Sequence, residues 1–164
     1  MQEETAYICR FPSPLGPITL SSDGEAVTGL WFAGQKRFGA ALPERQLQEN
    51  LPVLEQAKQW LTEFFDGSQP LPAPPLRPKG SAFQKAVWDQ LLTIPYGGTV
   101  TYGALAARLG SSARAVGNAV ARNPISLMIP CHRVVGAGGS LTGYAGGLDR
   151  KQWLLDLERQ DHQR

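Results

Sequence analysis

The stretch TYGALAARLGSSARAVGNAVAR, residues 101–122, contains two short helical patterns that are separated by a three-residue turn. Thr101 and Ser112 are residue types that cap helix N-termini, and Gly110 is the residue type that most often ends a helix. Two short helices joined in this way have the size and punctuation of a helix-turn-helix, although many helical proteins contain such pairs. The predicted helices span residues 102–109 and 113–122.

The second helix of this pair is rich in small residues. Ala or Gly occupies five of its positions, and its polar residues are Arg114, Asn118 and Arg122. Small residues let a helix backbone approach another surface closely, which fits either tight packing on a neighbouring helix or contact with a DNA groove. In the second case Arg114 is the side chain that reaches into the DNA.

Residues 1–80 precede these helices and divide into a β-rich part and a proline-rich segment. Alternating apolar residues and turn residues predict three strands, and apolar residues at helical spacing predict one amphipathic helix that ends at Gly67. Five prolines between residues 69 and 80 exclude a helix interior there and predict a stiff extended connector. The predicted strands span residues 7–11, 18–21 and 26–32, and the predicted helix spans residues 53–65.

A further helix begins after the connector. Ser81 is its N-cap, and the run Pro95-Tyr96-Gly97-Gly98 ends it. This order of elements predicts the α/β (α+β) class, with a small N-terminal sheet-and-helix subdomain before a helical, winged-helix-like domain that contains the helix-turn-helix. The predicted boundaries are 1–68 for the N-terminal subdomain, 69–80 for the connector and 81–164 for the C-terminal domain.

The composition excludes several classes of protein. The chain has 164 residues with two Cys and two His, too few for a multi-disulfide secreted scaffold and too scattered for a four-ligand zinc site. No apolar run approaches the roughly 20 residues that cross a bilayer, and the acidic start Met1-Gln2-Glu3-Glu4 is unlike a secretory signal. We therefore expect a cytoplasmic protein with no metal, no cofactor and no membrane contact.

The net charge of +2 conceals two unlike halves. Residues 1–80 hold seven Lys or Arg against nine Asp or Glu, a balance of −2, whereas residues 81–164 hold nine against five, a balance of +4. No Asp or Glu lies between Asp89 and Asp149. Two interpretations of this stretch are equally consistent with the charge pattern. It forms a phosphate-facing surface, or small and apolar residues leave few positions for charged ones. The basic residues of this acid-free stretch are Arg108, Arg114, Arg122 and Arg133.

Cys131 is the residue with the strongest indication of reactive chemistry. An apolar lead-in precedes it, His132 and Arg133 follow it, and the glycine-rich stretch 136–147 comes next. A cysteine is most often a small core residue, and Cys9, in a strand with no neighbouring His, is assigned that role.

The neighbours of Cys131 also constrain its mechanism. Nearby positive charge or an imidazole is predicted to lower the thiol pKa and to increase the thiolate fraction. Consecutive side chains of an extended chain point to opposite sides, so His132 reaches the sulfur only through a bridging water or at a bend. A cysteine-protease dyad normally brings Cys and His from distant segments, which argues against a hydrolase of that kind.

The run from Asn123 to Gly136, with Pro130-Cys131-His132-Arg133 at its centre, resembles the active-site signature of the O6-alkylguanine-DNA alkyltransferases, also called methylated-DNA–protein-cysteine methyltransferases. The resemblance covers residues 80–160 closely and the N-terminal third loosely. Further blocks in the order of that family are FQKAVW at 83–88, IPYG at 94–97, TY at 101–102, ARAVG at 113–117, TGYAGG at 142–147 and KQWLL at 151–155.

The resemblance implies DNA repair by direct transfer. Cys131 would take the alkyl group from guanine O6 in duplex DNA, irreversibly and once per molecule. His132 would accept the thiol proton through a water, Glu158 would hold His132 in the right tautomer, and Asn123 would tie the helix pair to the active-site loop. The resemblance also implies an RNase H-like fold for residues 1–68.

The same resemblance implies which residues bind DNA and the lesion. Arg114 would enter the base stack after a minor-groove approach, where the damaged nucleotide is flipped out. Tyr102 would crowd the neighbouring phosphate and bond the guanine edge, and Tyr144 would close over the extruded base. The other implied substrate-binding residues are Val134, through its backbone, and Ala145, and the other implied DNA-binding residues are Ala115, Gly117 and Asn118.

The implied partner is double-stranded DNA that contains O6-alkylguanine, with O4-alkylthymine as a second candidate lesion. The protein is expected to be a monomer in solution, and cooperative assembly on DNA stays open.

The sequence departs from the family pattern at two points: Ala145 stands where some relatives have a hydroxyl residue, and the zinc ligands of eukaryotic members are missing. A related group has Trp in place of the cysteine and only binds damage. A non-catalytic alkyl-damage-binding protein is therefore the alternative function, and an unrelated cysteine hydrolase is the third, but Cys131 favours the transferase.

Overall fold

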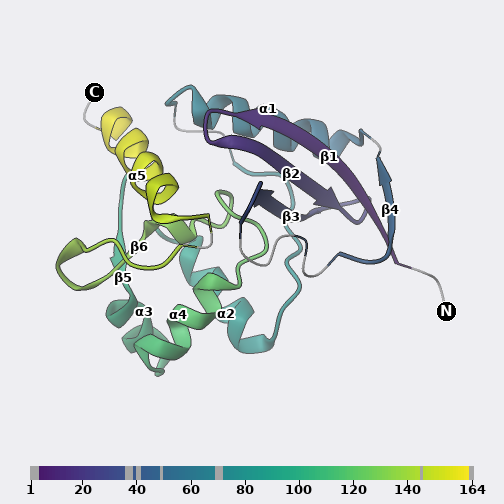
Figure 1. Cartoon of the computed structure of the whole chain (residues 1–164). Coiled ribbons are helices and arrows are strands. Elements are labelled where there is room, and N and C mark those ends of the chain that lie inside the picture. The colour runs from purple at the N-terminus through teal and green to yellow at the C-terminus, as the bar shows by residue number, and fades with distance from the viewer. Residues whose placement is uncertain are drawn as a thin grey trace.

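The computed structural model describes residues 4–35, 39, 42–48, 50–68, 72–144 and 146–162. Its N-terminal part is a four-stranded sheet in the order β3-β2-β1-β4 (Figure 1). Strands β1, β2 and β3 pair antiparallel in sequence order, whereas β4 pairs parallel with β1. The strands are β1 (Thr5–Ser13), β2 (Gly16–Ser22), β3 (Val27–Phe32) and β4 (Arg45–Gln48). The first three were predicted, but β4 was not, because its four residues are exposed and carry no alternating apolar pattern.

Helix α1 (Pro52–Phe65) packs across β1, β2 and β3 (Figure 1). Pro52 suits the first turn, where its fixed φ is helical and its missing N–H has no partner to lose. The rings of Trp60 and Phe64 stack on the buried side of the helix with centroids 5.3 Å apart. Each large apolar side chain that is fully buried contributes about 1.5–3 kcal/mol. Packing of this face therefore holds the helix predicted for residues 53–65 on the sheet.

The described part of the connector, residues 72–80, is extended and lies beside β3. The Val27 N–H donates to the Pro75 carbonyl at 2.8 Å, and the Arg77 N–H donates to the Val27 carbonyl at 2.8 Å. The connector is thus bonded to the sheet rather than spanning open space between two subdomains.

Four α-helices, two short 3-10 helices and two short strands follow the connector in the described C-terminal part. Trp88 on the first of them is almost fully buried, and its Nε1–H donates to the Ala119 carbonyl at 2.9 Å. Gly80 allows this packing, since a Cβ there would lie 2.4 Å from the Trp88 ring. The elements are α2 (Ala82–Leu91), β5 (Val100–Thr101), α3 (Tyr102–Leu109), α4 (Ala113–Ala121), η1 (Cys131–Arg133), β6 (Val134–Val135), η2 (Ala137–Gly139) and α5 (Leu148–His162).

Helices α3 and α4 form the predicted helix pair. The Thr101 and Ser112 side chains accept backbone N–H bonds at the two N-termini, at 3.0 and 3.1 Å. Gly110 ends α3 in the left-handed region, with φ of 61° and ψ of 37°, a conformation that glycine adopts without steric cost. The predicted fold class, an N-terminal sheet followed by a helical C-terminal part, is confirmed. No helix in the described part of the chain is long and apolar enough to cross a membrane.

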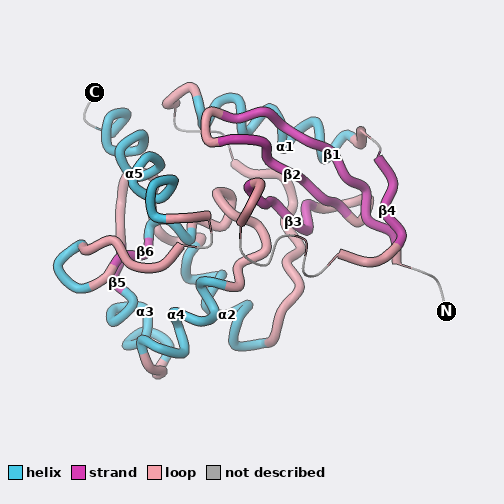
Figure 2. The backbone as a smooth tube through the Cα atoms, in the orientation of Figure 1, coloured by secondary structure: helices cyan, strands magenta, loops and turns pink. Residues whose placement is uncertain are grey.

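The chain between α4 and β6 is largely loop and lies between the sheet and the helices (Figure 2). Two backbone bonds join it to β3: the Leu30 N–H donates to the Pro124 carbonyl at 2.8 Å, and the Ser126 N–H donates to the Leu30 carbonyl at 3.2 Å. Leu127 then takes a left-handed conformation with φ of 71°, which costs a non-glycine residue about 1–2 kcal/mol. Its side chain is buried, so tertiary packing holds this backbone in place.

Candidate active site

Cys131 opens the η1 turn directly after Pro130. The residue is 4% exposed, and it lines a narrow pocket of about 50 Å³. The pocket lies between α3, α4 and the loop after η2, so the cysteine and the helix pair share one site. The other residues that line the pocket are Tyr102, Gly117, Val120, Ala121, Gly143 and Tyr144.

Burial raises the pKa of the Cys131 thiol. The Asn123 side chain and the Lys151 ammonium act in the opposite direction without overcoming it. The predicted net lowering of this pKa is therefore wrong for the protein at rest, because loss of solvation penalises the thiolate more than the nearby positive charge favours it. The nucleophile rests as a neutral thiol and needs a base. Cys9 is half-buried against the core of the sheet and α1, and burial raises its thiol pKa too.

His132 lies in the same turn and is fully buried. The chain therefore bends here, but His132 makes no hydrogen bond to the Cys131 sulfur among the described contacts, so proton transfer between them still requires a bridging water. The ring Nε2 lies 2.6 Å from Glu158 Oε2, whereas Nδ1 has no hydrogen-bond partner among the described residues. Because an ionised carboxylate only accepts hydrogen bonds, Nε2 carries a proton, and in the neutral form of the ring Nδ1 carries the lone pair.

Glu158 on α5 is the centre of a buried ion cluster. Arg133 donates from Nε to Oε1 at 2.8 Å and from Nη2 to Oε2 at 2.9 Å, a two-pronged contact. Its Nη1 donates to the Ile94 carbonyl at 2.9 Å, and the guanidinium lies 5.5 Å from the centre of the Tyr96 ring. Burial by itself raises the pKa of Glu158, but the charges and hydrogen bonds of His132 and Arg133 hold it at about 2. The carboxylate is therefore ionised at neutral pH.

Arg133 is the main site residue that the sequence analysis misplaced. Counting it with the arginines of a phosphate-facing surface is wrong, because its side chain is buried on Glu158. The signal available in the sequence was its position in a largely apolar run, with Leu127-Met128-Ile129 before it and Val134-Val135 directly after it. The exposed arginines of the acid-free stretch are Arg108, Arg114 and Arg122.

Asn123 is buried at the end of α4 and holds the segment before Cys131. Its Nδ2 donates to the Ile129 carbonyl at 2.8 Å, and its Oδ1 accepts from the Ile125 N–H at 3.0 Å. One side chain thus satisfies two buried backbone groups of the active-site loop and ties that loop to the end of α4.

Tyr102 lines the pocket, and Lys151 supports the loop that forms another of its walls. The Tyr102 hydroxyl donates to the Thr142 carbonyl at 3.1 Å, and Lys151 Nζ donates to the same carbonyl at 2.9 Å. Lys151 also donates to the Gly143 carbonyl at 3.2 Å and lies 5.8 Å from the centre of the Tyr102 ring. Sequence reasoning quoted Lys151 only as part of a family block, whereas its buried ammonium ties α5 to both the pocket loop and α3.

Of the remaining residues expected at the substrate, only Tyr144 is a described residue that lines the same pocket. Burial raises the pKa of its hydroxyl well above the usual value. Val134 is buried in β6, where it pairs with Val100 of β5. Ala145 lies outside the described residues. The described side chains include no group of three or more His, Cys, Asp or Glu that could hold a metal ion.

Apart from Tyr102, which opens α3, the residues expected to contact DNA lie on α4. Arg114 and Asn118 are exposed one turn apart on one side of the helix, and Ala115 is half-buried. Gly117 faces Tyr102, whose ring would lie 3.8 Å from a Cβ at that position. The exposed surface of α4 therefore adjoins the pocket that holds Cys131.

Comparison with known proteins defines the class of this two-part fold. The ribonuclease-like domain of 6-O-methylguanine DNA methyltransferase matches residues 6–73, and the DNA-binding domain of the same protein matches residues 82–160. The methylated-DNA–protein-cysteine methyltransferase of Haemophilus influenzae is 42% identical over 93% of this chain and 86% of its own length. That of Methanosarcina acetivorans is 44% identical over 93% and 97%.

A solved structure agrees with these relatives. Mycobacterium tuberculosis OGT in complex with DNA is 38% identical and superposes with a TM-score of 0.84 over 96% of this chain and 94% of that one. The chain belongs to the methylated-DNA–protein-cysteine methyltransferase family, and it is a DNA-binding methyltransferase of DNA repair.

Proposed function

We propose that this chain repairs duplex DNA by stoichiometric, irreversible transfer of an alkyl group from guanine O6 to Cys131. The observation that carries the proposal is the buried Cys131 thiol on a pocket, next to His132 with a free Nδ1 lone pair and an Nε2–H bound to ionised Glu158. This arrangement suits a thiol that is neutral at rest and loses its proton only when a substrate is in place.

The proposed reaction balances with no further reagent. The Cys131 proton passes through a water to His132 Nδ1, and the sulfur lone pair attacks the alkyl carbon. The S–C bond forms as the C–O6 bond breaks, and the released electron pair stays on guanine. Guanine takes up one proton, from the Tyr102 hydroxyl or from a water. The proton that His132 took from Cys131 then restores the proton of that donor. A thioether has no easy leaving route, so each molecule reacts once.

Access to the alkyl carbon requires that the damaged base leave the stack, at a cost of a few kcal/mol. We place α4 in the minor groove, where the small residues Ala115 and Gly117 permit close approach and the exposed Arg114 takes the position of the extruded base. Tyr144 and the backbone of Val134, which lie at or beside the Cys131 pocket, would then hold the guanine.

Mass spectrometry tests the proposal directly. The chain is mixed with a duplex that contains one O6-methylguanine, and the expected result is a gain of ~14 Da, one methyl group, on the peptide that contains Cys131. An unmethylated duplex of the same sequence is the control. Binding to the damaged duplex with no mass gain would overturn the proposal and favour a damage-binding protein.

A further inference from the structure

Arg133 has no part in the proposed bond changes, yet it is one of the most buried charges of the molecule. Each of its three side-chain nitrogens donates a hydrogen bond, Nε and Nη2 to the two Glu158 oxygens and Nη1 to the Ile94 carbonyl, and Tyr96 lies against its face. A buried ion pair is often no more stable than an apolar pair of similar volume, because both charges lose their hydration. Stability alone is therefore a weak reason for this arrangement.

The position of Arg133 relative to His132 supplies another reason. A buried carboxylate 2.6 Å from an imidazole stabilises the protonated imidazolium. An imidazolium has no lone pair, so it could not take the proton from Cys131. The positively charged Arg133 side chain pairs with the same Glu158 carboxylate that contacts His132, and its charge opposes protonation of the His132 ring.

The surroundings of His132 contain few other charges that could have this effect. Its own turn contributes Cys131 and Arg133, and α5 contributes Glu158. Helix α1 contributes the apolar ring of Phe64, whose centroid is 6.3 Å from that of His132. Helix α2 also packs on this turn, but its charged residues Lys85 and Asp89 are exposed to solvent. Within the described contacts of His132, Arg133 is thus the positive charge that offsets Glu158.

We propose that Arg133 is a positioning residue for alkyl transfer, an inference that rests on the proposed function. Its guanidinium holds the Glu158 carboxylate in one orientation and offsets its charge, so that His132 rests as a neutral imidazole with its Nδ1 lone pair available to the Cys131 proton. Arg133 acts through Glu158 and His132 and does not contact the substrate.

Nitrogen NMR of histidine-labelled protein tests this inference without any activity measurement. The chain has only two histidines, so His162→Gln leaves His132 as the single ring signal. In that background, Arg133→Gln removes the charge and keeps a hydrogen-bonding side chain, and Arg133→Lys keeps the charge and loses the two-pronged contact. Arg77→Gln is the matched control, because Arg77 also pairs with carboxylates but lies on the connector, away from Cys131.

The expected result is that the His132 ring takes up a proton about one pH unit higher in Arg133→Gln than in the parent. Arg133→Lys and Arg77→Gln should protonate within a few tenths of a unit of the parent. Single-turnover transfer from an O6-methylguanine duplex should show the same displacement on the acid side of its pH profile in Arg133→Gln. A folded Arg133→Gln variant with parental His132 protonation would overturn the inference.

If Arg133→Gln does not fold, the Arg133→Lys variant tests whether Arg133 acts as a positioning residue. A parental acid side of the pH profile together with a lower plateau rate would support the inference, because charge is kept while orientation is lost. A plateau rate equal to that of the parent would overturn it. If the parent itself transfers no methyl group, the proposed function fails, whereas the NMR result still reports on the Arg133–Glu158–His132 electrostatics.

Discussion

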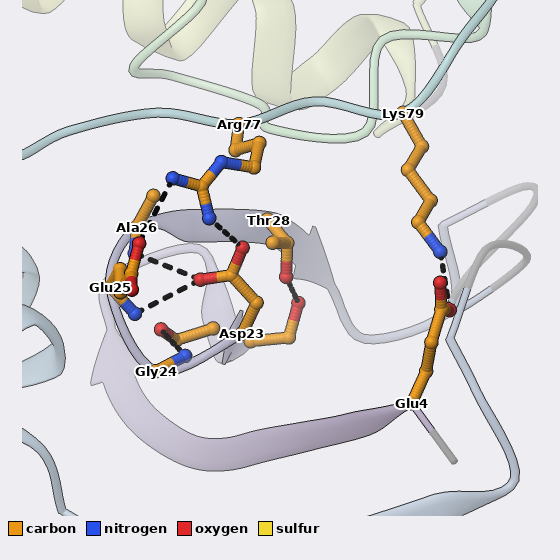
Figure 3. Close-up of polar contacts among 10 residues, drawn as sticks. Glu4, Asp23, Gly24, Glu25, Ala26, Thr28, Arg77 and Lys79 are labelled. Carbon is orange, nitrogen blue, oxygen red and sulfur yellow. Dashed lines mark hydrogen bonds and ion pairs between the residues drawn. The ribbon is translucent and has the colours of Figure 1, made fainter. Parts of the chain in front are cut away.

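Two clusters of arginine and carboxylate side chains lie in the two halves of the molecule, and they differ in exposure. Arg77 on the connector pairs with Asp23 and Glu25 of the β2–β3 turn (Figure 3). The side chains of Arg77 and Glu25 are 56% and 81% exposed. Those of Arg133 and Glu158, which make the same kind of pair beside His132, are 10% and 1% exposed.

Solvent exposure reduces the contribution of the Arg77 ion pairs to stability, whereas burial makes the protein sensitive to the loss of either partner in the Arg133–Glu158 pair. Exposed ion pairs contribute little because water and salt screen them, and the same holds for the Lys79–Glu4 pair further along the connector, at 2.6 Å (Figure 3). The connector is held in addition by its backbone bonds to Val27. In the buried cluster, removal of one partner leaves the other charge without water or counter-charge. Exposure, more than residue type, therefore predicts what a substitution does.

The largest effect is expected at the buried nucleophile. Cys131→Ser should lower methyl transfer by at least ~10³-fold, because a hydroxyl is a far weaker nucleophile than a thiol, and should keep binding to damaged DNA. Cys9→Ser is the matched control and should react at the parental rate. Mass spectrometry and a DNA-binding titration measure the two properties. Loss of DNA binding in Cys131→Ser would contradict a purely nucleophilic role.

Glu158→Gln comes next, since it removes the anion of the buried cluster and keeps its size. Transfer should slow by about 10²-fold because His132 loses its orienting charge, and unfolding should become easier by about 3–5 kcal/mol because Arg133 is left unpaired. Asp156→Asn, an exposed change two residues earlier on α5, should alter neither property. Rate measurements and urea unfolding at pH 7 check this, and equal effects of the two variants would contradict it.

The pH dependence of stability tests the same carboxylate. The pKa of Glu158 is about 2, below its ordinary value of 4.5, so its stabilising effect is complete above about pH 5 and is lost as the pH falls toward 2. The loss is on the order of 3 kcal/mol for a shift of this size. Urea unfolding from pH 6 to pH 3.5 should show a steeper decline in the parent than in Glu158→Gln, and parallel declines would argue against the buried ion cluster.

Arg114 is an exposed charge for which a functional effect is expected, because bound DNA would remove its water. Arg114→Ala should slow transfer from duplex DNA about tenfold and leave the slower reaction with free O6-alkylguanine nearly unchanged. Arg108→Ala, exposed on the last turn of α3, should weaken DNA affinity only modestly and in a salt-dependent way. Equal slowing of both substrates by Arg114→Ala would count against a role in base extrusion.

The smallest effect is expected at the exposed cluster. Arg77→Gln should leave both the transfer rate and the midpoint of urea unfolding close to those of the parent, because Asp23 keeps the backbone N–H bonds of Glu25 and Ala26. If Arg77→Gln destabilised the protein as strongly as Glu158→Gln, exposure would not be the property that separates the two clusters.

Local signals in the sequence were sufficient for much of the fold. The caps at Thr101 and Ser112 and the glycine at position 110 predicted α3 and α4, because capping depends on neighbouring residues only. Strand β4 was missed because its pairing with β1 is parallel and non-local. The resting state of Cys131 was also missed, since its thiol pKa depends on burial by segments that are distant in sequence.

The sequence by itself determined the class of elements, the helix pair, the resemblance to a DNA alkyltransferase family and the pair Cys131-His132. Only the tertiary structure decided that Arg133 turns inward to Glu158, 25 residues away, rather than outward to phosphate. It also decided that β3 pairs with the loop before Cys131. The physical reason is that hydration and charge pairing depend on which surfaces meet in space, and a local pattern of residues does not contain that information.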